Sequence, residues 1–392
     1  MLSMRLFSSV ICLGLLSLFA LGCATRAINE APPVTPLDPA KGAASADGKL
    51  LWFNALELDI DGQGWKDLKH PYDRLPGEAE GVVPTAVWSL SHHSAGLSVR
   101  FVTDSPVVAA RWSLRSENLA MNHMPATGVS GLDLYAKKDG EWRWVAIGRP
   151  EKPKGNEATL ISAAPAGAHE YLLYLPLYNG TDSLEIGVQP GSTLSQAPCY
   201  AGSCAKPLLF WGTSIVQGGC ASRPGMAYPS IIGRRMHRPV INLGFSGNGK
   251  MDPELVPLIA RLDVSAYVID CAPNMTPELI ADRTEPLVHA LRSAHPNTPI
   301  VLIENIRYQQ AWFTDKQRNA YAEKNAALKA AYSRLEAQGV KGLRYIPCDN
   351  LLGNDSEATV DGTHPTDLGS LRMADAIEPV LRRILNADSR GK

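Results

Sequence analysis

The feature that most constrains this chain is a change of hydrophobic rhythm near residue 206. Downstream of that point, short and largely apolar runs alternate with longer segments of helical periodicity. The apolar runs occupy residues 208–211, 240–243, 267–269, 300–303 and 343–346. Such runs are typical of strands buried on both faces. Their alternation with helical segments predicts an α/β fold built on a doubly wound parallel sheet.

The predicted helix boundaries agree with this fold class. Asp252-Pro253 and Thr276-Pro277 each offer a capping side chain followed by proline at the first helical position. The alanine-rich segment 315–338 ends at Gly339, a residue type that commonly terminates helices. In sheets of this type, ligands bind beyond the carboxyl ends of the strands. We therefore expect functional residues directly after each apolar run.

The upstream half of the chain has a different pattern. Between about residues 50 and 195, apolar and polar residues alternate in short segments such as 97–102 and 110–114, bounded by Gly, Asp, Asn or Pro. This spacing indicates an all-β sandwich or jelly roll. With 392 residues the chain is long enough for two cores. We expect a β-sandwich domain at 49–197 and a catalytic α/β domain at 206–388.

The N-terminus indicates export. An apolar stretch follows Arg5 and ends at Gly22-Cys23, and it is too short and wrongly flanked to span a membrane. The ending resembles a bacterial lipobox, so residues 1–23 are predicted to be a lipoprotein signal with lipidated Cys23. An ordinary cleaved signal peptide is the alternative.

The next residues extend that prediction. Ala24, by resemblance to bacterial lipoproteins, points to the outer membrane, facing the periplasm or the cell surface. Residues 24–48, rich in Pro and Ala, are predicted to be a tether.

Charge and cysteine content exclude several partners. The formal net charge is −1 and Lys and Arg form no run. We therefore expect that the chain does not bind nucleic acid, and that it contacts the membrane through the lipid anchor only. The cysteines after the signal lack zinc-site spacing, so no metal is expected. Cys220 and Cys271 each lie near a candidate catalytic block. They are hypothesised to form a disulfide, with two small buried apolar residues as the alternative.

Candidate catalytic groups follow three of the apolar runs, and a fourth group lies near the C-terminus. Ser214 comes after the first run and Gly247 after the second, in a loop of small residues. Asn274 follows the third, and Asp361 precedes His364 by three residues. A neutral His can take a proton from Ser when a carboxylate orients it. Taken singly, each residue also fits a helix cap, a turn or a surface loop.

A phosphate-binding loop is a competing interpretation of the second block. Residues 244–250 fit the spacing G-x-x-x-x-G-K, but Met251 stands where a Ser or Thr must bind magnesium. We therefore favour nucleophilic catalysis and expect no cofactor.

Together, the four blocks resemble those of SGNH/GDSL hydrolases. The resemblance implies that Ser214 is the nucleophile, His364 the base and Asp361 its orienting partner. It also implies an oxyanion hole formed by the N–H groups of Ser214 and Gly247 and the side chain of Asn274. Thr213 replaces the Asp of GDSL, and the third block departs from G-x-N-D, so the chain resembles a divergent branch.

The upstream segment Gly131-Leu132-Asp133-Leu134-Tyr135 resembles the GxDLY signature of a domain that precedes some bacterial SGNH esterase domains. Such two-domain proteins are similar to carbohydrate O-acetylesterases. The resemblance implies a serine esterase acting through an acyl-enzyme on acetylated poly- or oligosaccharides. The alternatives are a lipid or aryl esterase of lysophospholipase type and a non-catalytic glycan-binding lipoprotein.

Bulk near Ser214 bears on the choice among these alternatives. Pro273, Met275 and Trp312 are expected to close a small acyl pocket. His92 and His93 lie in a polar turn and are expected to be solvated.

Overall fold

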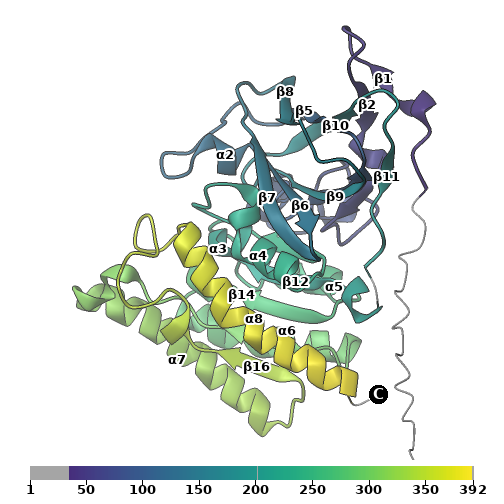
Figure 1. Ribbon diagram of the computed structural model, residues 1–392. Helices are drawn as coiled ribbons and strands as arrows, with labels where there is room; N and C mark the ends of the chain where they lie inside the picture. The colour runs from purple at the N-terminus through teal and green to yellow at the C-terminus, as the bar shows by residue number, and fades with distance from the viewer. Residues whose placement is uncertain (1–34, 201, 391–392) are drawn as a thin grey trace, which may run out of the picture. The chain divides into compact units, whose positions relative to one another are not determined.

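The computed structural model describes residues 35–200 and 202–390. The predicted signal and Cys23 lie outside the described residues. Two antiparallel sheets form the first half of the described chain, and one parallel sheet with helices forms the second half (Figure 1). Every helix in the described ranges is too short or too polar to cross a membrane.

The sandwich consists of a five-stranded and a six-stranded sheet. The first has the order β1-β2-β10-β5-β8, and the second has the order β11-β4-β9-β6-β7 with β3 paired to β4. The strands are β1 (Ala43–Ala44), β2 (Leu51–Asn54), β3 (Asp59–Asp61), β4 (Ser98–Thr103), β5 (Val108–Leu114), β6 (Leu132–Lys138), β7 (Glu141–Gly148), β8 (Asn156–Ile161), β9 (His169–Tyr174), β10 (Thr181–Val188) and β11 (Leu194–Gln196). The predicted all-β domain is confirmed.

Alternation along the strands builds the sandwich core. In β5, Val108, Ala110, Trp112 and Leu114 are buried in one apolar cluster with residues of the facing sheet, while Arg111 points outward and pairs with Glu185. This period of two is what an antiparallel strand with one buried face requires.

The tether prediction is wrong for its second half. Ala43 and Ala44 pair with β2, residues Pro39–Lys41 form a 3-10 helix, and Leu37 N–H donates to Leu194 O at 2.7 Å. The sandwich edges offer unpaired backbone groups, and the chain satisfies them here. Backbone pairing of this kind needs no apolar periodicity, so the pattern gave no sign of it.

The second half is the predicted doubly wound fold. Its parallel strands are β12 (Leu208–Gly212), β13 (Val240–Gly244), β14 (Ala266–Asp270), β15 (Ile300–Ile303) and β16 (Leu343–Ile346), in the order β13-β12-β14-β15-β16. The order reverses at β12, where ligands bind in such sheets.

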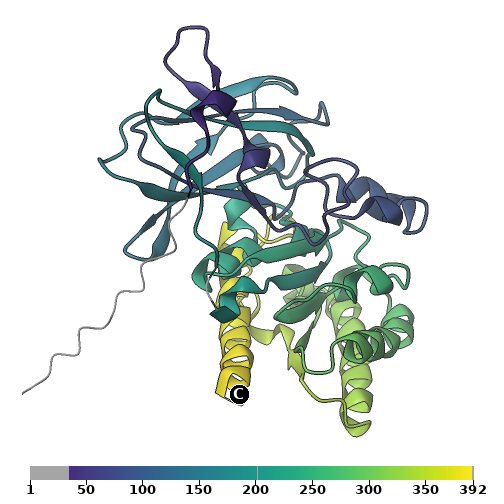
Figure 2. The same cartoon turned by 90° about the vertical axis from the view of Figure 1, so that its right-hand side faces the viewer.

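Helices cover both faces of this sheet (Figure 2). Trp211 and Leu209 pack on one face with α6 and α7, and Phe210 and Leu208 pack on the other with α4 and α8. The helices are α1 (Thr85–Ser91), α2 (Ala126–Val129), α3 (Ser214–Gln217), α4 (Tyr228–Arg235), α5 (Val256–Ile259), α6 (Pro277–Ala294), α7 (Asp315–Ala337) and α8 (Asp367–Arg390).

Helix boundaries match the predictions at α6 and α7 but not at α5. Thr276 caps α6 by accepting from Leu279 N–H, and α7 ends just before Gly339. The helix expected from Pro253 begins only at Val256. Pro257 lacks an N–H and is tolerated only in a first turn, which fixes the start directly before it.

The sandwich half also contributes to the core of the parallel-sheet half. Trp65, Leu75, Val83 and Val87 are buried in the same apolar cluster as Trp211. The buried guanidinium of Arg74 donates to the backbone oxygens of Asn242 (3.0 Å) and Gly244 (2.8 Å) at the end of β13. The two halves therefore share packing close to the strand ends that carry the candidate site.

Candidate active site

Ser214 lies at the turn from β12 into α3, at the position expected for a nucleophile. Thr213 caps this short helix by accepting from Ile215 N–H. The turn is tight: a Cβ on Gly212 would lie 2.3 Å from a methyl carbon of Val216. Ser214 is only 6% exposed, so its hydroxyl faces a narrow space.

A chain of two hydrogen bonds joins three of the predicted site residues. Ser214 Oγ lies 2.8 Å from His364 Nε2, and His364 Nδ1 lies 2.7 Å from Asp361 Oδ2. With a proton on Nδ1 donated to Asp361, Nε2 can accept the proton of the Ser214 hydroxyl. Residues 150 positions apart in the sequence are thus placed in hydrogen-bonding reach.

The charge state of Asp361 suits this arrangement. Partial burial disfavours the carboxylate, but hydrogen bonds from the backbone and side chain of His364 and from Thr363 N–H outweigh it. The pKa of Asp361 therefore lies below its ordinary value. A carboxylate beside the imidazole stabilises the imidazolium that forms when the base takes a proton.

The Asp361–His364 loop is held at both sides. Val360 N–H donates to His364 O at 2.9 Å, closing the loop on itself. The 3-10 helix Gln309–Trp312 supplies two further bonds, from Gln309 N–H to Gly362 O (2.9 Å) and from the Gln310 side chain to Asp361 O (3.0 Å). Gly362 has φ +90°, which favours glycine.

The other predicted residues supply hydrogen-bond donors around Ser214. Among the described residues, none accepts from the N–H of Ser214 or of Gly247. Asn274 Oδ1 accepts from Gly249 N–H at 3.2 Å, which leaves its amide N–H groups for a ligand. Gly249 itself packs against β12, since a Cβ there would lie 2.0 Å from Gly212 O. These donors can hold an oxyanion.

Sequence reasoning missed a bracing group from the sandwich half. Gln217 of α3 donates to His93 Nδ1 and to Leu177 O, both at 3.0 Å, and Tyr178 OH donates to Ser214 O at 3.3 Å. His93 was expected to be solvated, and that expectation is wrong. Burial, aided by the charge of Arg74, lowers the pKa of His93 to about 3, so it is neutral and accepts.

The predicted disulfide is not formed. Cys220 and Cys271 are both free thiols in the structure. Cys271 is fully buried in the apolar cluster of one sheet face, and its Sγ donates to Trp211 O at 3.5 Å. Cys220 lies beside His364 instead. Closeness to two strand ends did not fix the directions in which the side chains point.

The expected acyl pocket also differs. Met275 is buried in the core and Trp312 is 74% exposed, so they do not close a pocket together. Gly219 packs against His364 instead: a Cβ there would lie 3.3 Å from His364 Cδ2 and 3.0 Å from Tyr178 Oη.

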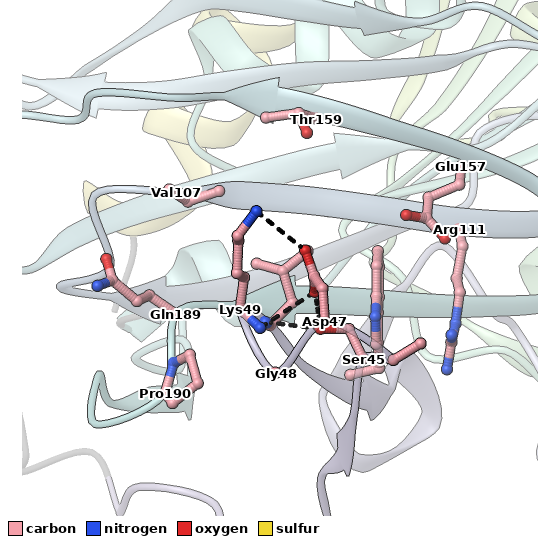
Figure 3. A pocket seen from close by; sticks show the side chains of 13 residues that line it. Ser45, Asp47, Gly48, Lys49, Val107, Arg111, Glu157, Thr159, Gln189 and Pro190 are labelled. Carbon is pink, nitrogen blue, oxygen red and sulfur yellow. Dashed lines mark hydrogen bonds and ion pairs between the residues drawn. The ribbon is translucent and has the colours of Figure 1, made fainter.

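A separate hollow of about 930 Å³ lies on the sandwich (Figure 3), and neither Ser214 nor His364 is among its lining residues. Trp52 and Arg111 line it, with the Arg111 guanidinium over the Trp52 ring at 4.5 Å. Of its charged lining residues, Lys49 pairs with Asp47 and Arg111 with Glu185, and none of the candidate catalytic residues lines it.

Comparisons with known proteins decide the family. A sequence profile of the GDSL-like lipase/acylhydrolase family matches residues 205–382, and one of the N-terminus of SGNH-hydrolase-type esterases matches residues 50–194. A protein from Bacteroides ovatus ATCC 8483 named as a GDSL-like lipase is 37% identical, with a TM-score of 0.81 over 86% of this chain and 98% of that one. The chain belongs to the GDSL-like lipase/acylhydrolase family. The two profiles confirm the two resemblances found in the sequence, to SGNH/GDSL hydrolases and to the GxDLY segment.

More distant structures share the fold of this SGNH esterase. The salicylyl-acyltransferase SsfX3 from a tetracycline biosynthetic pathway is 19% identical, with a TM-score of 0.67 over 89% of this chain and 97% of that one. The acetyl xylan esterase Est2A from the rumen bacterium Butyrivibrio proteoclasticus is 12% identical, with a TM-score of 0.55 over 86% and 99%. No curated protein shows a significant match.

Proposed function

We propose that this SGNH esterase hydrolyses short acyl esters, acetate esters above all, on carbohydrate. The observation that carries the proposal is the hydrogen-bond chain from Ser214 Oγ through His364 to Asp361, at 2.8 Å and 2.7 Å. A nucleophile, a base and a carboxylate that fixes the base are what acyl transfer to serine requires.

The proposed reaction has two halves. In the first, Ser214 Oγ attacks the ester carbonyl while His364 Nε2 takes its proton. The resulting oxyanion accepts hydrogen bonds from the N–H groups of Ser214, Gly247 and Asn274. Its collapse expels the alcohol, which takes the proton from His364, and leaves an acyl-serine. In the second half, water attacks the acyl-serine with His364 as base, releasing the acid and restoring Ser214.

Two features support a small acyl group and a bulky alcohol. Ser214 is nearly buried, and Gly219 with the Tyr178 hydroxyl crowds the space next to the base. By contrast, Trp312 and Phe313 form an exposed aromatic pair, 5.3 Å apart, at the end of the 3-10 helix that holds the Asp361 loop. Exposed aromatic surface beside a site marks ligand contact. Acetyl xylan esterase as a structural neighbour favours carbohydrate.

The same aromatic pair favours the second candidate, an aryl or lipid esterase, because it could also contact an aromatic or acyl group. A series of acetate, butyrate and octanoate esters separates the two. We expect kcat/KM to fall steeply with chain length, since each extra methylene meets a closed space. A rise with chain length would favour the lipid esterase and leave the catalytic residues unaffected.

Covalent labelling tests the mechanism itself. A fluorophosphonate should label the wild-type protein at one serine, identified by mass spectrometry as Ser214. Ser214→Ala should abolish labelling, and both Ser214→Ala and His364→Ala should lower turnover by on the order of 10⁴-fold or more. An unlabelled wild type without activity on any ester would instead indicate the glycan-binding lipoprotein.

We also propose that lipidated Cys23 anchors the enzyme to a bacterial membrane, with the outer membrane favoured by Ala24. The Gly22-Cys23 ending of the apolar stretch supports this. Cys23→Ala should release the protein into the soluble fraction, because alanine cannot carry the lipid that is proposed to anchor the protein. Membrane fractionation of the variant identical to wild type would overturn the anchor.

A further inference from the structure

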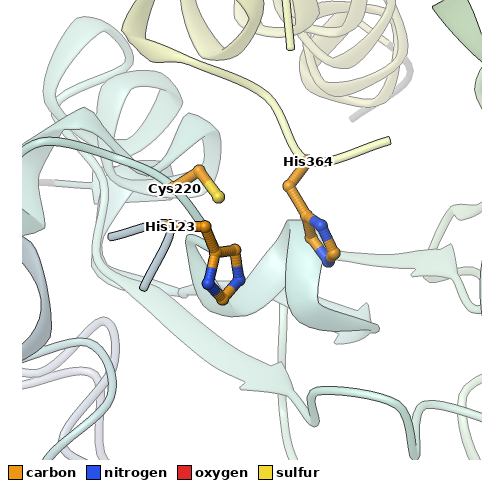
Figure 4. A group of neighbouring side chains, drawn as sticks. All are labelled: His123, Cys220 and His364. Atoms are coloured by element: carbon orange, nitrogen blue, oxygen red, sulfur yellow. The ribbon is translucent and has the colours of Figure 1, made fainter. Parts of the chain in front are cut away.

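Three side chains capable of binding a soft metal ion meet beside Ser214. His123, Cys220 and His364 each offer one ligand atom, and these atoms all lie within 4.8 Å of one another (Figure 4). They come from three separate segments: the sandwich turn between β5 and α2, the turn after α3, and the Asp361 loop. Neither His123 nor Cys220 has a role in the proposed reaction.

Hydrogen bonds orient both imidazoles toward the shared space. His364 Nδ1 is held by Asp361 Oδ2 at 2.7 Å, and His123 Nδ1 lies 2.8 Å from Asn122 Oδ1. This leaves Nε2 of His123 without a hydrogen bond to a described residue, and Nε2 of His364 with the single hydrogen bond to Ser214 Oγ at 2.8 Å, which a metal would replace. A histidine whose second nitrogen is fixed by an oxygen acceptor is the usual arrangement around protein-bound zinc.

The segments that carry Cys220 and His123 are locked together. Thr127 Oγ1 donates to Ser222 O at 2.7 Å, and a Cβ on Gly128 would lie 2.2 Å from Ala221 O. Cys220 is buried, adopts φ +66°, and has a thiol with no hydrogen bond to any described residue. Its sulfur is therefore held near the two imidazoles without another partner.

We propose that His123, Cys220 and His364 form a site for Zn²⁺ whose occupation reversibly inhibits the esterase. One thiolate and two imidazoles are ligands that zinc prefers, and a fourth position stays open to water. Tetrahedral ligands lie roughly 3.3–3.8 Å apart at zinc distances, so the three groups need to converge by about 1 Å. Binding replaces the thiol proton of Cys220, which leaves to solvent.

Zinc inhibits the esterase in this proposal because it binds the nitrogen that the reaction requires. Zinc on His364 Nε2 replaces the hydrogen bond from Ser214 Oγ, so the base can no longer accept a proton. This consequence rests on the proposed function, whereas binding rests on the geometry alone. The two are therefore measured separately.

Binding is tested on the full chain after removal of metal with a chelator. Calorimetry with Zn²⁺ should show one site, and Co²⁺ should give the near-ultraviolet charge-transfer band of a thiolate ligand. Cys220→Ala should abolish the band, and His123→Ala should weaken binding by about tenfold or more, the least that loss of a direct ligand should cost. Ser214→Ala should bind at least as tightly as wild type, because zinc then displaces no hydrogen bond at His364 Nε2. The exposed Cys199→Ala and His289→Ala are matched controls that should also bind as wild type.

Inhibition is tested with acetate ester hydrolysis. Micromolar Zn²⁺ should inhibit the wild type, a chelator should restore activity, and Mg²⁺, which prefers oxygen ligands, should have no effect. His123→Ala and Cys220→Ala should keep basal activity and need about tenfold or more Zn²⁺ for the same inhibition. Absent binding, or binding unaltered in both variants, would overturn the site. Binding without inhibition would overturn the inhibitory role of the site, whereas the role of His364 as base is tested separately by His364→Ala.

Discussion

Gln217 Nε2 lies 3.0 Å from His93 Nδ1, so a side chain of the sandwich half holds the helix that begins at Ser214. Gln217 also donates to Leu177 O, and its Oε1 accepts from Ser246 N–H at 3.0 Å. One glutamine thereby connects the sandwich, the helix that begins at Ser214 and the loop of Gly247. The sandwich is structurally part of the candidate site.

The first prediction concerns the pH dependence that His93 imposes. Burial lowers the pKa of His93 from 6.5 to about 3, so the folded protein holds it neutral while the unfolded chain binds a proton below pH 6.5. The contribution of His93 to the free energy of unfolding is therefore fully present above pH 6.5. It decreases as the pH falls below 6.5, by about 1.4 kcal/mol per pH unit. His93→Gln, which stays neutral, should reduce this loss.

Urea unfolding at pH 7.5 and 5.5 measures the effect. The difference in the free energy of unfolding between wild type and His93→Gln should change by about 1.4 kcal/mol between the two pH values. The exposed His289→Gln is the control and should unfold like wild type at both. Equal shifts for the two variants would show that His93 is not held neutral.

The second prediction separates the two ends of the Asn274 amide. Its oxygen accepts from Gly249 N–H, and its N–H groups are proposed to bind the oxyanion. Asn274→Asp keeps the acceptor and loses the donor, whereas Asn274→Ala loses both. Both should lower kcat by on the order of 10²-fold, the usual effect of one oxyanion donor, with little change in KM.

Steady-state kinetics on an acetate ester tests this, with the exposed Asn350→Ala as control. If Asn274→Asp retained wild-type kcat while Asn274→Ala lost it, the residue would act by holding Gly249 rather than by donating to the oxyanion.

Local patterns predicted the elements whose burial is complete. Four of the five parallel strands are buried along their whole length, which makes them largely apolar runs such as Ile300–Ile303, whereas β16 at the sheet edge has Arg344 exposed. β8 gives a much weaker sequence signal, because only one of its six residues is buried. The candidate residues Ser214, Gly247 and Asn274 could be predicted from the sequence because parallel strands bring their carboxyl ends to one edge.

Contacts between the halves were not accessible from local pattern. His93 and His123 lie in polar turns without periodicity, and their partners Gln217 and His364 lie 124 and 241 positions away. Such contacts depend on how two cores pack. The position of the Cys220 sulfur could not be predicted either. Cys220 has a left-handed backbone conformation, which cysteine rarely adopts and which the sequence therefore does not indicate.

The third prediction concerns Gly362, between Asp361 and His364. A Cβ there would lie 1.8 Å from the Gln310 side chain, in a backbone conformation of φ +90°. Gly362→Ala should displace the loop and lower kcat by on the order of 10²-fold, since small misplacements of catalytic groups have effects of that size. The double variant Gly362→Ala/Gln310→Ala should regain part of the loss.

Gly339→Ala is the matched control for this experiment. Gly339 has φ +77° at the end of α7, but a Cβ there would meet open space. The substitution should lower the free energy of unfolding by about 1 kcal/mol and leave kcat unchanged. Similar kcat losses in both variants would point to backbone strain rather than to the contact with Gln310.

The last prediction concerns Asp270, at the end of β14. It is fully buried, and only one of its carboxyl oxygens has a hydrogen-bond partner among the described residues, the Tyr228 hydroxyl at 2.9 Å. Burial raises its pKa from 3.8 to about 7, against the opposing effect of that hydrogen bond. The folded protein therefore keeps a proton that the unfolded chain loses above pH 4.

The sign is opposite to that of His93. The contribution of Asp270 to the free energy of unfolding is fully present below pH 4. It falls as the pH rises toward 7, by about 4 kcal/mol in all. Asp270→Asn cannot ionise, so the variant should become more stable relative to wild type as pH rises. Any cost of leaving the new amide without a partner is the same at every pH and affects only the baseline.

Urea unfolding of wild type and Asp270→Asn at pH 4.5, 6 and 8 provides the measurement. Because His93 is present in both proteins, its contribution cancels in the difference. We expect the difference to change by several kcal/mol between pH 4.5 and 8, in favour of Asp270→Asn. A constant difference would mean that Asp270 stays ionised in the fold, and that its burial is compensated by groups other than Tyr228.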